Sequence, residues 1–318
     1  MKIFEQIQQL DRRWIYLVLA LAIILPLIIP FNSRTHTTKP TENLYRMVDS
    51  FTPAPGEDPV EKDRAILMVF MHDASTMPEL FPMELAMLRH CFERNIKVFT
   101  LTFLATAAPI IDYAINTVKE EFPDKTSGVD YVNFGYKVGS LYLPIILGMG
   151  EDISEIVDID AEGRKLSSLP IMTNIKNYNE MNLVVEFSGS SAGAGWITYA
   201  RSRFGTNVAV GVTAVMAADT YPQLNTGQLI GMLAGLKGAA EYEKLVDVFA
   251  SKDKEFSKEN LRNEAEDTTI TNPDIPYKFK QARIGMNAQS VAHILIIVFI
   301  LIGNIGFFIQ KYKQNKEM

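Results

Sequence analysis

Cysteine is almost absent from this chain, and positive charge is in the minority. Cys91 is the only cysteine, so an intramolecular disulfide and a metal site built from several cysteines are both excluded. Acidic residues outnumber Lys and Arg by 37 to 31, and the net charge of −6 argues against a nucleic-acid-binding protein with a broad basic surface. With 19 Gly and 15 Pro in 318 residues, the chain is neither collagen-like nor of low complexity.

The apolar residues gather in two runs near the ends of the chain. Residues 14–31 carry no charge, and residues 290–309 contain no acidic residue, Lys or Arg. A membrane-spanning helix needs about 20 apolar residues, so both runs are predicted to span a lipid bilayer, the first at the short end of the range. The alternatives are a cleaved signal peptide and a buried helix. No small-residue cleavage pattern follows Phe31, and Lys311, Lys313 and Lys316 follow the second run, which favours two spans.

Charge next to the spans bears on their orientation. Three Lys or Arg residues lie on each side of each span, so simple counting gives a tie. Short segments decide orientation, and the tails 1–13 and 310–318 are short and basic, whereas the region between the spans is long. We therefore expect both termini in the cytoplasm and the intervening domain outside it.

Between the spans, the chain divides into a connector, a compact domain and a tether. Residues 32–62 form the connector, in which the Pro-rich stretch Thr52–Pro59 follows a short amphipathic piece. Residues 63–250 are predicted to fold as one domain, and residues 251–289, rich in charge of both signs, as a tether.

Within 63–250 the apolar pattern alternates between strands and helices. Strands are expected at 65–70, 97–103, 130–136, 182–187 and 207–215, and helices at 78–94, 107–121, 139–149, 171–180, 194–204 and 225–249. Such alternation is typical of βαβ units. The predicted fold is α/β, with a Rossmann-like, doubly wound, mostly parallel sheet of about five strands.

The loops after the strands carry the polar residues from which a site could be built. In a parallel sheet, ligands bind beyond the carboxyl ends of the strands. The sharpest motif is Gly189-Ser190-Ser191-Ala192-Gly193, a G-x-S-x-G sequence between a strand and a helix, as in the nucleophile elbow of hydrolases. Ser191 would then need a partner from His72 or Asp219. The alternative is a chance match, because Gly and Ser are common after strands.

The same loop is also a candidate for ligand binding. Its backbone N–H groups could hold an anion at the start of a helix, and the candidate contacts are Ser190, Ser191, Gly193, His72 and Asp73. It is neither a phosphate-binding loop with Lys nor a complete dinucleotide fingerprint. The sequence assigns no cofactor and no metal. His72, Asp73 and His90 could be metal ligands, but capping or solvated roles are the stronger interpretation of these residues.

A stripe of glycines marks the predicted helix 225–249. Gly227, Gly231 and Gly235 recur every four residues, and Gly238 extends the stripe. Each glycine weakens a helix by about 1 kcal/mol relative to alanine. We expect them to allow close packing, either against the sheet of the same chain or against another subunit in a homo-oligomer.

Three stretches, DRRWIYLVLALA, STMPELFPMELAMLRHCF and YPQLNTGQLIGMLAGLKGAAEYE, resemble a family of prokaryotic two-span membrane proteins with no assigned activity. The resemblance implies the two-span layout and transfers no catalytic residue. The hypothesis from sequence is a non-catalytic structural or accessory subunit of a membrane-anchored, self-associating assembly. The alternative is a small-ligand-binding or serine-hydrolase-like domain that uses the loop 188–195.

Overall fold

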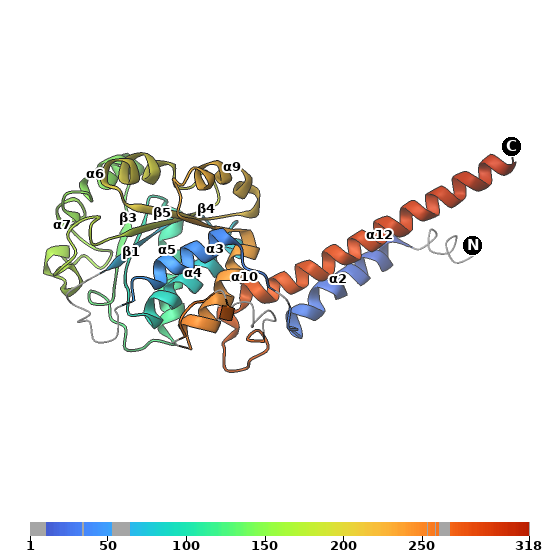
Figure 1. Cartoon of the computed structure of the whole chain (residues 1–318), viewed down its shortest axis with the longest axis horizontal. Helices are drawn as coiled ribbons and strands as arrows, with labels where there is room; N and C mark the ends of the chain where they lie inside the picture. The colour runs from blue at the N-terminus through green and yellow to red at the C-terminus, as the bar shows by residue number, and fades with distance from the viewer. Residues whose placement is uncertain are drawn as a thin grey trace.

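The computed structural model contains an α/β domain from which two helices project side by side (Figure 1). It describes residues 11–33, 35–52, 64–252, 254–257, 259–260 and 268–317. In this part of the chain, six strands form one parallel sheet in the order β3-β2-β1-β4-β5-β6. The strands are β1 (Ala65–Met71), β2 (Lys97–Thr102), β3 (Tyr131–Tyr136), β4 (Leu183–Ser188), β5 (Asn207–Val212) and β6 (Gly231–Ala234). The predicted Rossmann-like α/β class is confirmed, with one strand more than expected.

The strands are buried because helices cover both faces of the sheet (Figure 1). One face carries α3 (Lys39–Asp49), α4 (Met77–Glu93), α5 (Ala108–Lys119) and α10 (Gly235–Leu245). The other carries α6 (Tyr142–Gly148), α7 (Ile153–Ile156), the π-helix Trp196–Arg201, α8 (Ser202–Phe204) and α9 (Ala214–Asn225). Because successive side chains of a strand point to opposite faces, each strand contributes to two separate cores.

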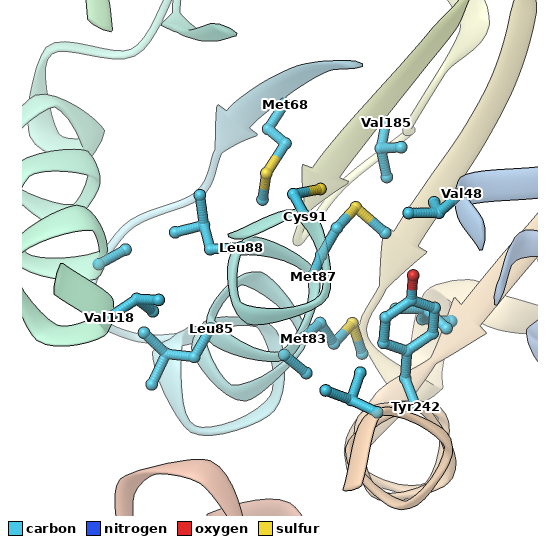
Figure 2. Close-up of a cluster of buried hydrophobic side chains, with 14 of the residues drawn as sticks. Val48, Met68, Met83, Leu85, Met87, Leu88, Cys91, Val118, Val185 and Tyr242 are labelled. Atoms are coloured by element: carbon cyan, nitrogen blue, oxygen red, sulfur yellow. The ribbon is translucent and has the colours of Figure 1, made fainter. Parts of the chain in front are cut away.

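The larger core lies between the sheet and the helices α3, α4 and α10 (Figure 2). Met68 from β1 and Val185 from β4 meet Met87 and Cys91 of α4 there. Cys91 is fully buried, and burial raises the pKa of its thiol far above the usual range. The single cysteine is therefore a core residue, with no reactive thiolate at neutral pH.

The prediction of one helix over 225–249 is wrong. Helix α9 ends at Asn225, the strand β6 follows at Gly231–Ala234, and α10 begins at Gly235. The four-residue strand is too short to show a period of its own, and the apolar residues beside it imitate a helical stripe. The helix expected at 171–180 is also absent, since only the 3-10 turn Pro170–Met172 forms there.

The four glycines of the predicted stripe therefore do not share a helix face. Gly227 lies in a turn with φ +73°, and Gly235 has φ +58° at the end of β6. At Gly231, a Cβ atom would lie 2.7 Å from Leu44 Cβ and from the Pro40 carbonyl oxygen, so this glycine lets α3 pack directly on β6. Gly238 similarly allows α10 to approach the backbone of Leu233. These contacts are internal to the chain, so the glycine-faced helix that was to form an oligomer interface does not exist.

The connector and the tether are shorter than predicted. Helix α3, within 32–62, packs against β6 and α10, with Leu44, Tyr45 and Val48 fully buried. Residues 53–59 of the Pro-rich stretch lie outside the described residues, as does part of the tether. The described end of the tether is joined to the domain, because Ile270, Phe279 and Ala282 are buried. The domain thus includes residues on both sides of 63–250.

The two projecting helices are α2 (Arg12–Ile28) and α12 (Gln281–Glu317), which pack along each other (Figure 1). Within the described part of the chain, α12 is the one helix long and apolar enough to cross a membrane, over Gln281–Ile309. Helix α2 has 17 residues. The C-terminal prediction is therefore supported by a continuous apolar helix.

Candidate functional site

The carboxyl edge of the sheet brings together several of the predicted site residues. His72 follows β1 and is buried, and it pairs with Glu84 of α4, which sequence analysis did not single out. The His72 Nε2–Glu84 Oε1 distance is 2.6 Å, and both side chains are inaccessible. His72 Nδ1 lies 3.1 Å from the Asp73 carbonyl oxygen. A carbonyl only accepts, so Nδ1 carries a hydrogen and a single proton is left between Nε2 and Oε1.

This pairing leaves no nitrogen of His72 for another partner. Burial lowers the pKa of His72, but the hydrogen bond and charge of Glu84 outweigh that effect and raise it. Burial raises the pKa of Glu84. The pair is neutral overall whichever group holds the shared proton, which is how two ionisable groups are accommodated in a core.

The serine-rich loop after β4 does not form the predicted nucleophile elbow. An elbow holds its serine in a strained backbone, yet among the described residues other than glycine only Asn95 has a positive φ. The Ser190 N–H donates to Ser188 Oγ at 3.1 Å, so the loop is closed by its own side chains. Asp219 is exposed on α9. Ser191, His72 and Asp219 are thus not assembled into a catalytic group.

The loops that follow β1 and β4 lie against each other. These strands are neighbours in the sheet, and the order of connections reverses between them. A Cβ at Gly189 would lie 2.8 Å from Thr76 Cγ2, so the two loops are in contact. The exposed Asp73 carboxylate accepts from the Ser75 N–H and hydroxyl at 2.8 and 2.6 Å, and these bonds lower its pKa. Asp73 is therefore occupied in its own turn.

Thr76 and Glu79 lie at the start of α4, and the Glu79 side chain bonds to a different helix. Thr76 precedes α4 but makes no side-chain cap hydrogen bond. Glu79 Oε2 instead accepts from the Ala214 N–H at 2.8 Å, at the first residue of α9. This carboxylate links the loops after β1 and β5 and satisfies a free N–H group of another helix.

Beneath the serine-rich loop lies a buried acid, Glu186 of β4. Burial raises its pKa to about 7, although the nearby Gly193 backbone and Trp196 side chain lower it in part. Gly193, a predicted ligand contact, has φ +75°. Its backbone amide thus contributes to the environment of a buried carboxyl.

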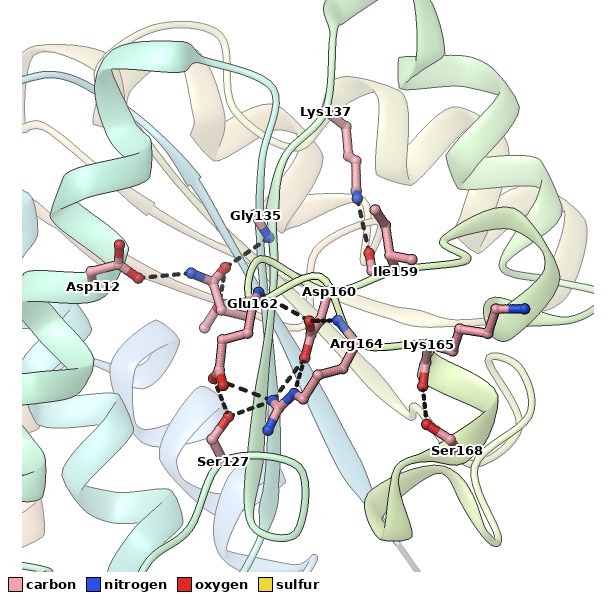
Figure 3. A network of polar contacts seen from close by, with 12 residues as sticks. Asp112, Ser127, Gly135, Lys137, Ile159, Asp160, Glu162, Arg164, Lys165 and Ser168 are labelled. Atoms are coloured by element: carbon pink, nitrogen blue, oxygen red, sulfur yellow. Dashed lines mark hydrogen bonds and ion pairs between the residues drawn. The ribbon is translucent and has the colours of Figure 1, made fainter.

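A second polar cluster lies beside the end of β3 (Figure 3). Asp160 accepts from the backbone N–H groups of Glu162 and Arg164 at 3.0 and 2.8 Å, and its carboxylate pairs with the Arg164 side chain at 2.7 Å. Arg164 also donates to Ser127. These hydrogen bonds and the ion pair hold the loop 160–164 in place, which is a structural role.

The densest group of buried charge is elsewhere, where α10 meets the start of α12. Glu243 accepts from the backbone N–H groups of Ala282 and Arg283 at 3.0 Å each, and so caps the first turn of α12. Asp247 pairs with Arg283 and with Arg89 of α4. We call Arg89, Glu243, Asp247 and Arg283 the charged joint.

Burial controls the electrostatics of the charged joint. Arg283 is 1% exposed and Asp247 is fully buried. Burial raises the pKa of Glu243 to about 8, although Arg283 and the two backbone N–H groups lower it in part. Charged groups removed from water in this way are tolerated only when they are paired and hydrogen-bonded.

Helix α10 also holds the segment that leads into α3 from α2. Glu241 Oε2 accepts from the Thr38 N–H and hydroxyl at 2.9 and 2.7 Å, and Lys244 Nζ donates to the Thr35 carbonyl at 3.0 Å. Asn287 of α12 donates to the Phe31 carbonyl at 2.7 Å. One helix of the domain therefore fixes the bases of both projecting helices.

Sequence analysis missed these residues of α10. The sequence does contain a sign of buried charge at this helix. Glu241, Glu243 and Lys244 point to more than one side of it, so at least one of these charged side chains must face the interior. Their partners lie far away in sequence, which periodicity cannot detect.

Among the described residues, no group of three or more His, Cys, Asp or Glu side chains is arranged to hold a metal ion. Comparison of the chain with protein-family models, with curated protein sequences and with solved structures finds no match.

Proposed function

We propose that this protein is a non-catalytic accessory subunit, which holds a Rossmann-like domain at a membrane surface through a two-helix anchor. The observation that carries the proposal is the charged joint. Its buried ion pairs and the helix cap by Glu243 join the domain to α12. Hydrogen bonds from Glu241 and Lys244 of α10 hold the segment that follows α2, so the domain is tied to the bases of both projecting helices.

The first part of the proposal is that α2 spans the bilayer beside α12. Its side chains are apolar and exposed, for example Leu25 at 53% and Ile28 at 70%. Trp14 and Tyr16 lie at its first turn, as aromatic residues do at a membrane boundary, and Arg12 and Arg13 can extend from a short span to the headgroups. Contact with α12 along its length compensates for its 17 residues.

The second part is the orientation, with both tails in the cytoplasm and the domain on the other side. It follows from the basic character of the two short tails.

Cysteine labelling in intact cells tests the topology. Cys91 is buried, so the wild-type chain should be silent toward a membrane-impermeant maleimide and serves as the control. Single replacements Gln6→Cys, Asp124→Cys and Asn315→Cys place a thiol before α2, on the domain and after the span. We expect labelling of D124C in intact cells, and of Q6C and N315C only after lysis. Labelling of Q6C together with D124C would show that α2 does not cross the membrane.

Native mass spectrometry of the full chain, extracted in detergent, tests the accessory role. We expect a defined complex with other polypeptides and no retained small molecule. A monomer that carries a small molecule would overturn the accessory role and direct attention to the loops around His72 and Ser190.

A further inference from the structure

Helix α12 is continuous over 37 residues. One of its faces packs against the domain near the start of the helix and continues beyond the domain further along. Near its start, Ala282 is buried in the α4–α10 core and Met286 packs against the same core. A helix turns once in 3.6 residues, so His293 and Asn304, 11 and 22 residues after Ala282, lie on the same face. The helix face that packs against the domain at Ala282 is therefore the same face that carries His293 and Asn304 in the apolar part of α12.

Helix α2 covers the opposite face. The less exposed positions in the apolar part of α12 are Val291, Ala292, Leu295, Phe299, Ile302, Gly306 and Ile309. These positions lie about 100–180° around the helix from His293 and centre on the opposite side. The anchor thus leaves the His293 side uncovered.

We define the His293–Asn304 face as His293, Ile297, Ile300 and Asn304. All four side chains are exposed, Ile297 at 57% and Ile300 at 56%. Their spacing of four, three and four residues is that of a helix–helix packing seam. Neither polar side chain makes a hydrogen bond to another residue in the described part of the chain.

Two polar side chains on a lipid-facing surface are energetically unfavourable. If 290–309 spans the bilayer, His293 and Asn304 lie about 10 and 7 Å from its middle, on either side. Polar groups at such depths usually face another helix and hydrogen-bond to it. We therefore expect this face to pack against another helix that supplies hydrogen-bond donors or acceptors to His293 and Asn304.

The placement of the domain decides what kind of helix fits. A second copy would lie parallel to the first, because every copy has the same orientation in the membrane. Its α12, packed on this face, would continue into the space that α10 of the first copy occupies beside Ala282 and Gly285. A helix of another protein that ends near the level of Gln289 avoids this conflict.

We propose that the His293–Asn304 face binds a membrane-spanning helix of a different protein, one with a hydrogen-bonding side chain such as Asn, Gln, Ser or Thr at the depth of Asn304. This inference rests on the proposed function and names its partner by chemical class. The contact would lie within the bilayer. It would use the same face of α12 that packs against the domain nearer the start of the helix.

The first test uses a synthetic partner in phosphatidylcholine vesicles. The full-length chain, labelled at Asn315→Cys, is mixed with a 20-residue polyleucine helix that carries one Asn, or with the all-Leu helix, and association is measured by energy transfer. We expect the Asn helix to bind the wild-type sequence about 3- to 20-fold more tightly than N304L. Asn304→Gln should retain binding, and Ile305→Leu, at the same depth but off the face, should behave as wild type. Equal association of the Asn helix with N304L and wild type would overturn the proposal.

The second test uses disulfide cross-linking in cell membranes, with Ile300→Cys on the face and the similarly exposed Ile294→Cys about a third of a turn away around the helix. A self-cross-linked dimer of I300C would show that a second copy occupies the face and would overturn the proposal. A photo-cross-linker at Ile300 should give an adduct with a membrane-helix peptide of another protein, weakened by N304L and absent at Ile294. If an alkaline carbonate wash releases the chain from the membrane, the proposed membrane anchor is wrong. If the chain stays in the membrane but gives no such adduct, only the proposed contact with another helix is wrong.

Discussion

The carboxyl edge of the sheet and the charged joint use polar residues in opposite ways. At the sheet edge, Asp73 and Ser190 bond to atoms within two residues of themselves and remain near solvent. At the joint, Asp247 and Arg283 are buried and bond across 36 residues of sequence. Local bonds shape a loop, whereas buried long-range pairs fix elements relative to each other. The charged joint is thus the kind of contact that the proposed role, a domain held on a membrane anchor, requires.

The largest effect should come from the joint. Asp247→Ala leaves Arg89 and Arg283 buried beside each other, and we expect it to lower the free energy of unfolding by about 3–5 kcal/mol. Ser191→Ala, at the sheet edge, should change it by less than about 0.5 kcal/mol. Chemical denaturation of the full chain in detergent micelles measures both. Equal losses would remove the distinction between the two regions.

The next effect should be a pH dependence that originates at Glu186. Its carboxyl has a normal pKa of 4.5 and a pKa of about 7 in the fold. The folded state holds the proton where the unfolded state has lost it, so stability should fall by about 3 kcal/mol as pH rises from 4.5 to 7. Glu186→Gln should reduce the fall of stability with pH by this amount in unfolding curves recorded across that range, whereas Glu243, whose pKa is also raised, should still contribute. A slope unchanged by the substitution would assign the proton to another group.

Substitution of Gly231 should distinguish the strand β6 from the helix that the sequence pattern predicted at this position. In a helix, Gly231→Ala would stabilise the chain by about 1 kcal/mol. Against α3, the new methyl group meets Leu44 and Pro40, and we expect a loss of about 1–3 kcal/mol. Gly139→Ala is the control, because a Cβ there meets nothing within 4 Å. The sign of the change in thermal unfolding distinguishes the two structures.

The smallest effect, a null result, is expected at Ser191. Since both ring nitrogens of His72 are occupied, no base is available to it, and a fluorophosphonate should leave the wild-type chain unmodified. Mass spectrometry of the treated protein measures this directly, with a known serine hydrolase as the positive control. A stoichiometric adduct lost in S191A would restore the hydrolase hypothesis.

Long apolar periods made most of the fold predictable. The buried run at 65–70 and the helical stripe from 78 to 94 appear in the structure as β1 and α4, with ends that differ by one residue. The edge strand β6 was missed because four residues define no period. The candidate site was predicted less well. The sheet edge was located correctly, but Glu84, Glu186 and the charged joint depend on contacts between distant segments.

The sequence by itself determined the class of fold, the apolar C-terminal helix and, from its single cysteine, the exclusion of an intramolecular disulfide. These properties depend on local composition and on periods of two and 3.6 residues. Only the tertiary structure decided that Gly231 admits α3, that His72 is paired with Glu84, and that the charges of α10 hold the bases of α2 and α12. The reason is physical: burial and pairing are properties of residues brought together from distant parts of the chain, and no local pattern records which partners will meet.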